Sequence, residues 1–310
     1  MPTTDADKEA GVAKLKKIQS FIKEVAEGRP NDVRKAAKAV GSDAGAVADG
    51  NRRTALHLAA QRGDVGVLDV VLSLEGVDIN AADKGGSTPL MVAAERGHAR
   101  CVSRLLERGG SPVHAQPGGY TPLHAAAAAG CREACEALAD AAAVLVEAPS
   151  PVGTPLLAAC QRGQPSVVEA LLSRGADAAG AKLASGVGAA HLAAASGDDA
   201  CLRAVLAAGA DAGAAGEGRV TALHIAAGHP RASPSAVGIL LDAGSSPDAE
   251  DAAGMKPVHA AAQQGRREAV GRLLQVTTRG ARDSDWTVEG LMAAGKRARE
   301  AAEAEAEKAA

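Results

Sequence analysis

A short motif close to Thr-Pro-Leu-His returns seven times along this chain of 310 residues. Its copies begin at positions 54, 88, 121, 154, 188, 221 and 256, so that successive copies lie 34, 33, 33, 34, 33 and 35 residues apart. Repetition at a fixed period near 33 is typical of a solenoid, because each unit buries its apolar face only against its neighbours. The chain is therefore expected to carry its function on an extended surface.

The composition restricts the core and the partners of such an array. Only 1% of the residues are aromatic, although 46% are hydrophobic, so the core must consist of Ala, Leu and Val in closely packed helices. Large cofactor pockets are not expected in such a core. The formal net charge of -3 offers no general attraction to phosphate backbones, which requires a concentrated basic surface. Nucleic acid is therefore not an expected partner.

The second repeat illustrates how one unit folds. Residues 83–87 carry two glycines and predict a hairpin-like turn. Thr88 is a helix cap followed by Pro89, which is favoured at the first helical position. The pattern predicts a first helix to residues 95–96 and a second from about 99 to 107, before Gly109 and Gly110 end the unit. Each repeat is thus expected to consist of a turn, a helix, a turn and a helix.

This pattern resembles the ankyrin repeat, whose motif contains Gly-x-Thr-Pro-Leu-His-x-Ala-Ala followed by Gly-His and a Leu-rich second helix. It is matched by residues 86–111, 119–140, 153–177 and 186–211, and the resemblance covers roughly residues 47 to 280. The resemblance implies an all-α solenoid of stacked antiparallel helix pairs with hairpin loops and a groove floored by the first helices. It also implies protein binding rather than catalysis.

A closer resemblance, to ankyrin proteins that often carry C-terminal tetratricopeptide repeats, rests on residues 53–63 and 285–291. In that group the arrangement implies work beside chaperones. No tetratricopeptide pattern is visible in this chain, which ends at Ala310. A chaperone-linked or targeting adaptor is an alternative function that rests on this resemblance alone.

Three regions are predicted: an N-terminal helical cap over residues 1–46, an array of about seven repeats over 47–280, and a C-terminal capping segment with a charged helix over 281–310. A helix over residues 7–27 would place apolar residues on one face and lysines on the other, with residues 31–40 as its partner helix. The apolar set is Val12, Leu15, Ile18, Ile22 and Val25, and the lysines are Lys14, Lys16, Lys17 and Lys23. The helix is interpreted as a cap, and a membrane-surface tether is the alternative.

Two repeats depart from the pattern. In the fifth, Gly188-Ala189 replaces Thr-Pro, which removes the capping hydroxyl at a typical cost of about 1 kcal/mol. The sixth carries extra residues at positions 229–234 between its helices. This loop is expected to bulge on the face away from the hairpins.

The residues that could suggest chemistry have structural interpretations. Five histidines stand three residues after a repeat start, where they can bridge the cap and the neighbouring repeat: His57, His124, His191, His224 and His259. Their separation by about 10 Å, the spacing of packed helices, excludes a shared zinc ion. Cys101 and Cys201 occupy the slot of Val67 and are predicted to be buried. No catalytic residue, metal site or cofactor is predicted.

The cysteines and the absence of targeting segments indicate the cellular compartment. Five scattered cysteines favour a reducing environment, and no signal peptide or membrane-spanning stretch is visible. The sequence thus predicts a cytoplasmic protein, with a nuclear location left open.

The exposed surface remains as the candidate site of a protein-protein interaction scaffold or adaptor. One row would line the groove and could bind an acidic segment of a partner protein, although ordinary solvated charge is the alternative: Arg62, Arg96, Arg162 and His229. The predicted hairpin tips vary in residue type: Arg52, Arg53, Asp83, Lys84, Glu217 and Arg219. Tyr120 is a candidate binding hot spot, with packing against the next hairpin as the alternative, and Trp286 is expected to seal the last repeat.

Overall fold

The computed structural model describes residues 5–279 and 285–309. These described residues form 17 α-helices and three short 3-10 helices and contain no β-strand, so the predicted all-α repeat fold is confirmed. Isolated antiparallel bridges close three of the hairpins, at Ala48–Thr54, Lys182–Gly188 and Ala215–Thr221. The chain divides into two compact units, residues 1–151 and 152–310, which are described separately.

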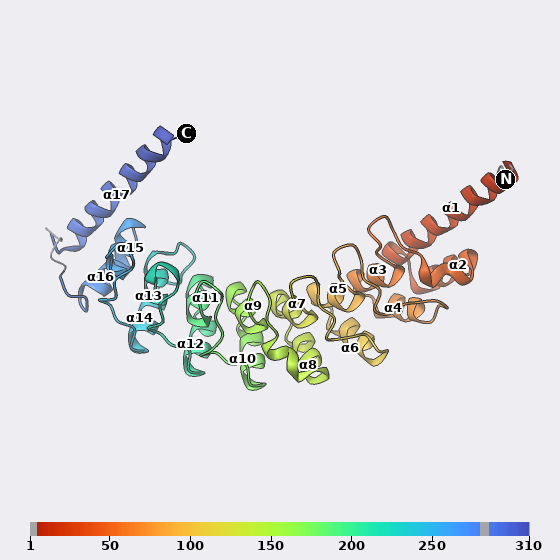
Figure 1. Cartoon of the computed structure of the whole chain (residues 1–310), viewed down its shortest axis with the longest axis horizontal. Coiled ribbons are helices and arrows are strands. Elements are labelled where there is room, and N and C mark those ends of the chain that lie inside the picture. Colours follow the sequence, from red (N-terminus) through yellow and green to blue (C-terminus); the bar gives the residue numbers. More distant parts are fainter. Residues whose placement is uncertain (1–4, 280–284, 310) are drawn as a thin grey trace. The chain divides into compact units, whose positions relative to one another are not determined.

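The N-terminal unit contains two leading helices and three helix pairs (Figure 1). Its elements are α1 (Asp5–Glu27), α2 (Pro30–Val40), η1 (Ser42–Ala46), α3 (Ala55–Arg62), α4 (Val65–Leu72), α5 (Pro89–Glu95), α6 (Ala99–Glu107), α7 (Pro122–Ala129), α8 (Arg132–Ala141) and η2 (Ala143–Glu147). The first helices α3, α5 and α7 pack side by side, as do the second helices α4, α6 and α8. The unit is therefore two layers of helices with hairpins at one edge.

The C-terminal unit repeats this arrangement with four pairs and one final helix. Its elements are α9 (Pro155–Arg162), α10 (Pro165–Ser173), α11 (Ala189–Ser196), α12 (Asp199–Ala207), η3 (Glu217–Arg219), α13 (Ala222–Gly228), α14 (Ala236–Asp242), α15 (Pro257–Gln263), α16 (Arg267–Leu274) and α17 (Val288–Ala309). Helix α17 packs against α15 and α16. It thus covers the end of the array from the position that a further first helix would take.

The repeat histidines perform the predicted bridging. In the first repeat, Nδ1 of His57 accepts a hydrogen bond from the backbone N–H of Thr54 at 3.0 Å, so the ring proton is on Nε2. That Nε2 donates to the carbonyl oxygen of Ser87 in the next hairpin at 2.9 Å. The equivalent bonds link His191 to Val220 at 3.1 Å and His224 to Met255 at 2.9 Å. Each ring therefore joins a helix start to the neighbouring repeat.

Four repeats lack part of this cap. Met91 and Leu157 replace the histidine of the second and fourth repeats, and Gly188 and Lys256 replace the threonine of the fifth and seventh. In the fifth, His191 still accepts a hydrogen bond from the backbone N–H of Gly188 at 3.2 Å, so only the threonine hydroxyl is lost there. In the fourth, Leu157 occupies the histidine position. The buried hydroxyl of Thr154 consequently has no hydrogen-bond partner among the described residues.

The leading helix is buried differently from the prediction. Phe21 and Val25 of α1 are fully buried, whereas Val12 and Leu15 are 52% and 59% exposed. The expectation of one continuous buried face is thus wrong for the first half of this helix. Only its second half reaches the helices that it contacts, α2 and α3.

The described cysteines are free thiols. Cys101 and Cys201 are fully buried, which confirms their interpretation as small core residues. Burial raises the pKa of Cys101 to about 11 and that of Cys160 to about 12. Both thiols are therefore protonated, unreactive members of the core at neutral pH.

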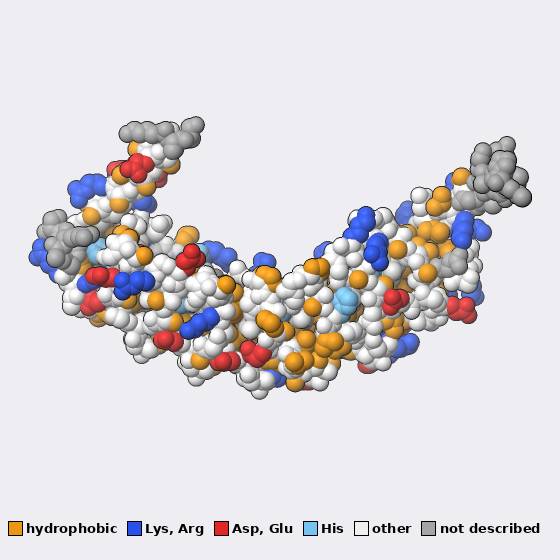
Figure 2. Space-filling model, in the orientation of Figure 1, with side chains coloured by type: hydrophobic (Ala, Val, Ile, Leu, Met, Phe, Trp, Pro, Cys, Tyr) orange, Lys and Arg blue, Asp and Glu red, His pale blue; other side chains and the backbone are white. Residues whose placement is uncertain are grey.

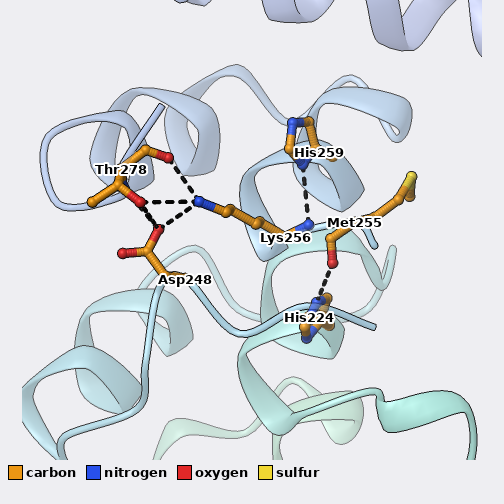
Figure 3. Close-up of polar contacts among 6 residues, drawn as sticks. All are labelled: His224, Asp248, Met255, Lys256, His259 and Thr278. Atoms are coloured by element: carbon orange, nitrogen blue, oxygen red, sulfur yellow. Dashed lines mark hydrogen bonds and ion pairs between the residues drawn. The ribbon is translucent and has the colours of Figure 1, made fainter. Parts of the chain in front are cut away.

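A buried lysine fastens the last repeat. Lys256 stands where most repeats have threonine, and its Nζ donates to Oδ1 of Asp248 at 2.9 Å and to the carbonyl and hydroxyl oxygens of Thr278 at 2.8 and 3.0 Å (Figure 3). All three ammonium protons thus have acceptors. Burial acts to raise the pKa of the Asp248 carboxyl, but the bond from Lys256, its charge and the two bonds from Thr278 to Asp248 lower it overall. This cluster ties the segment after α16 to the hairpin before α15.

Candidate functional site

In six repeats the residue two positions before the repeat start lies in the left-handed region of backbone space. Four of these positions hold glycine, as expected for positive φ: Gly86, Gly119, Gly186 and Gly254. The other two hold arginine, Arg52 with φ 60° and Arg219 with φ 58°. A residue other than glycine is strained in this region because of its Cβ atom, at a cost of roughly 1 kcal/mol or more. These two tips therefore keep an arginine side chain at a cost to stability.

Neighbouring hairpin tips are joined through the backbone. The N–H of Lys84 donates to the carbonyl oxygen of Asn51 at 3.0 Å. This bond places the exposed side chains of Arg52 and Lys84 on adjacent tips. Figure 2 shows basic side chains gathered over the hairpins beside α3 and α5.

Two pockets lie in the groove of the N-terminal unit. One, of about 160 Å³, is lined by Arg53, Asp83, Glu95 and Arg96 among others. The second, of about 310 Å³, is lined by Arg53 and by Arg62. Four of the predicted site residues, Arg53, Arg62, Asp83 and Arg96, thus lie along one groove.

Some of these groups already have partners within the unit. Arg53 pairs with Asp49, with 2.9 Å between its Nη2 and Oδ2 of the carboxylate. Arg62 donates to the carbonyl oxygen of Val25 at 3.4 Å, which anchors α1. Asp83 uses Oδ1 to accept hydrogen bonds from the backbone of its own hairpin. Arg53, Arg62 and Asp83 therefore support the groove as well as line it.

The side chain of Arg96 is exposed and has no hydrogen bond or ion pair within the described residues. It lies beside Glu95 in the same pocket. Burial raises the pKa of the Glu95 carboxyl, and the charge of Arg96 lowers it in part. Arg96, Arg52 and Lys84 are thus the exposed cations of this groove and its tips.

The other predicted residues occupy separate places. Tyr120 is half-buried, and its ring packs at 5.2 Å from that of His124 in its own repeat. Arg162 on α9 and Glu217 in η3 are exposed. Trp286 packs edge-on against His259, with 6.3 Å between the ring centroids, in keeping with its predicted contact with the last repeat.

A larger pocket in the C-terminal unit was not predicted from the sequence. It has a volume of about 470 Å³ and is lined by residues of α11, α13 and α15. His229 and Pro230 from the extra residues of the sixth repeat form part of its wall, together with Asp251 and Met255 of a hairpin. The prediction that this loop faces away from the hairpins is therefore wrong for His229 and Pro230.

Within residues 5–279 and 285–309, no three His, Cys, Asp or Glu side chains are grouped so that they could hold a metal ion. None of the described helices is both long and apolar enough to span a bilayer.

Comparison with known proteins identifies the fold family. A model of ankyrin repeats in three copies matches residues 23–114, 56–148, 111–181 and 190–289. The structure is similar to the crystal structure of the human ASB11 ankyrin repeat domain, with a TM-score of 0.63 and 28% sequence identity. The match covers 72% of this chain and 96% of that one.

Shorter stretches are similar to curated proteins. They include cortactin-binding protein 2 of Ornithorhynchus anatinus, 50% identical over 62 residues, and the probable E3 ubiquitin-protein ligase XBOS31 of Oryza sativa subsp. japonica, 49% identical over 63 residues. Each match covers 20% of this chain, and 4% and 14% of those proteins. The closer resemblance to tetratricopeptide-bearing relatives stays a prediction. From the extent of the family match, this chain belongs to the ankyrin-repeat family, whose repeats indicate a protein-protein interaction domain.

Proposed function

We propose that this chain is a non-enzymatic scaffold or adaptor that binds an acidic segment of a partner protein on the groove and hairpin tips of its N-terminal unit. The support comes from the backbone bond between Lys84 and Asn51, which sets two exposed cations on adjacent tips. Arg96 adds a third cation in the groove pocket. A guanidinium offers two parallel N–H donors to a carboxylate, so arginine suits this recognition.

The strain at Arg52 supports the same proposal. Glycine would adopt its φ of 60° without strain, as Gly86 and Gly119 do in the next two repeats. An arginine at this tip is therefore better explained by contact with a partner than by the turn itself. Tyr120, whose ring rests on His124, is proposed as an aromatic contact near the same groove. The proposed contacts in the C-terminal unit are Arg162, Glu217, Arg219 and His229.

A defined acidic probe tests the proposal. A fluorescein-labelled helical peptide rich in glutamate is titrated with the full chain, and anisotropy gives the affinity at two salt concentrations. The variant combines Arg52→Gly, Lys84→Ala and Arg96→Ala. Each of the three cations is expected to form one exposed ion pair with a glutamate of the peptide. Removal of all three should lower the affinity about tenfold. Binding by the wild type should also weaken as salt is raised.

The matched control removes three other exposed cations of the same unit, with Lys38→Ala, Arg100→Ala and Arg108→Ala. This control has the same net charge as the test variant, so a general charge effect would weaken both equally. Equal affinities of the two variants, with both folded by circular dichroism, would refute the proposed surface.

A membrane-surface tether is a second candidate, because Val12 and Leu15 of α1 are exposed beside the exposed Lys16 and Lys17. Flotation of the full chain with anionic vesicles at low salt tests it, and a Leu15→Glu variant should lose any binding. Protein that stays at the bottom of the gradient argues against the tether.

A chaperone-linked role rests on resemblance alone, and crosslinked immunoprecipitates without chaperone subunits would count against it. We assign the chain to the cytoplasm or nucleus, in keeping with its free thiols.

A further inference from the structure

Two of the positions that line the pocket of the C-terminal unit carry small residues. Gly228 on α13 stands seven residues after its repeat start, where the first and fourth repeats have Gln61 and Gln161. Ala260 on α15 stands four residues after its start, where leucine occurs at positions 58 and 192. A Cβ on Gly228 would lie 3.3 Å from the Cβ of Ala260, so α13 and α15 approach closely here and neither position places a long side chain in the pocket. The pocket, of about 470 Å³, falls in the range of sites that bind ligands.

One wall of this pocket is held by a single arginine. Nη1 of Arg266 donates to the carbonyl oxygens of Ala226 at 2.6 Å and His229 at 3.1 Å, and its Nη2 donates to that of Ala232 at 2.8 Å. These bonds fix the end of α13 and the extra residues that follow it. Because His229 and Pro230 line the pocket, its wall is set before any partner arrives. Such preorganisation lowers the cost of binding.

The rim of the pocket carries a carboxylate without the cation that an equivalent repeat supplies. In the first repeat, Oδ1 of Asp49 accepts hydrogen bonds from its hairpin backbone, and Oδ2 pairs with Arg53. In the seventh repeat, Oδ1 of Asp251 accepts the same backbone bonds. Met255 stands there in the position of Arg53, so among the described residues Oδ2 of Asp251 has no ion pair.

The pocket thus combines an apolar interior with one uncompensated carboxylate at its rim, among Ile225, Met255 and Ala260. We propose that it binds a partner segment that places an apolar side chain in the pocket and a neighbouring lysine or arginine against Asp251. Charge complementarity favours this occupant, because an acidic segment at the rim would place its negative charge against the Asp251 carboxylate. The pocket belongs to the C-terminal unit and favours a cation, whereas the groove and tips of the N-terminal unit are proposed to bind an acidic segment. Of the further contacts proposed above for the C-terminal unit, His229 is the one that also lines this pocket.

Methionine methyl resonances give a direct test in the full chain. The four methionines are labelled with ¹³C at the ε-methyl, so that Met255 reports on the pocket and the buried Met91 of the N-terminal unit serves as internal reference. The probe is the acetylated, amidated peptide Gly-Ser-Leu-Lys-Ser-Gly. Two matched peptides replace its Lys by Glu or its Leu by Ser. The Met255 resonance should shift with the first peptide, at least threefold more weakly with the Glu peptide, and not with the Ser peptide.

Two substitutions separate the features of the pocket. Asp251→Asn keeps an oxygen for the hairpin bonds but removes the charge, so it should abolish the preference for Lys over Glu and retain the need for Leu. Ala260→Leu introduces the residue found at positions 58 and 192 and should fill the pocket and remove the response to all peptides. Unchanged thermal unfolding of Asp251→Asn keeps the test valid even if Ala260→Leu folds poorly.

Several outcomes would overturn the proposal. Equal titrations by the Lys and Glu peptides would remove the role of Asp251, and equal titrations by the Leu and Ser peptides would remove the role of the pocket. Movement of the Met255 resonance with protein concentration, in the absence of peptide, would assign the pocket to a second copy of the chain instead. None of these results depends on Arg52, Lys84 or Arg96, so the proposal stands or falls separately from the proposed acidic-partner surface.

Discussion

Nε2 of His57 lies 2.9 Å from the carbonyl oxygen of Ser87, so a side chain of the first repeat hydrogen-bonds the hairpin of the second. The proton is available for this bond because Nδ1 accepts from the cap of its own helix. The neutral ring therefore satisfies both repeats at once, whereas a doubly protonated ring would place a donor against the Thr54 N–H. Stability of the stack is thus linked to the protonation of these histidines.

The first prediction concerns pH. Burial lowers the pKa of His57, His191 and His224 below the ordinary value of 6.5. The unfolded chain takes up protons first as pH falls below 6.5, so stability should fall from there through the folded pKa values, by at most about 1.4 kcal/mol per pH unit for each histidine. Guanidinium midpoints at pH 7.5 and 5 measure this loss. A variant with glutamine at all three positions should show a smaller difference, and a constant wild-type midpoint would contradict the linkage.

The second prediction concerns the orphaned hydroxyl of the fourth repeat. Thr154→Val removes a buried hydroxyl that lacks a partner, so it should leave stability unchanged or raise it by up to about 1 kcal/mol. Thr121→Val is the matched control, because the Thr121 hydroxyl lies 2.8 Å from Nδ1 of His124. That variant should lose about 1 kcal/mol or more. Chemical denaturation of both variants checks the difference in sign, and equal losses would be inconsistent with it.

The third prediction concerns the buried lysine. Lys256→Met leaves Asp248 without its cation and should lower stability by about 2 kcal/mol, below the value for fully buried pairs because the Asp248 side chain is 36% exposed. Addition of Asp248→Asn should cost less in this background than in the wild type. Lys296→Met is the control, since its pair with Glu300 lies at the surface and contributes little. Thermal unfolding of the four variants provides the comparison. Equal effects of Lys256→Met and Lys296→Met would rule out a stabilising role for the cluster of Lys256, Asp248 and Thr278.

The fourth prediction applies one chemical change at two glycines. A methyl group on Gly295 of α17 would collide with the backbone of Ala262 on α15, whereas one on Gly271 of α16 would meet no atom within 4 Å. Gly295→Ala should therefore destabilise the packing of α17 by about 1–3 kcal/mol. Gly271→Ala should instead stabilise by up to about 1 kcal/mol, because alanine favours helix. Hydrogen exchange of α15 and α17 measures the first effect, and a stabilising Gly295→Ala would mean that the helices are not in contact there.

Features set by neighbouring residues were predictable. The boundaries of α5 and α6 match the expected ones because Thr88, Pro89 and the glycines at positions 97 and 109 act within a few residues of themselves. The bridging histidines were equally accessible, since their place is fixed relative to the cap. The packing of α1 was not predictable. Its apolar residues recur along the whole helix, but its first half extends beyond the helices that it contacts, so Val12 is exposed.

The candidate surfaces divide in the same way. Exposure of Arg52 and Arg96 follows from their place in the repeat, but the engagement of Arg62 with Val25 depends on where another helix ends. The pocket beside Gly228 requires a loop wall, hairpin residues and three helices together.

By itself the sequence determined the number and order of the repeats, the start of the first helix in each repeat and the family, because caps, turns and periodicity are local and recur at a fixed spacing. Only the tertiary structure decided which side chains the repeats share, such as Lys256 with Thr278 and Arg266 with the end of α13. Those contacts join residues 22 and 40 positions apart. They depend on how the helices and loops pack against one another, which no local pattern encodes.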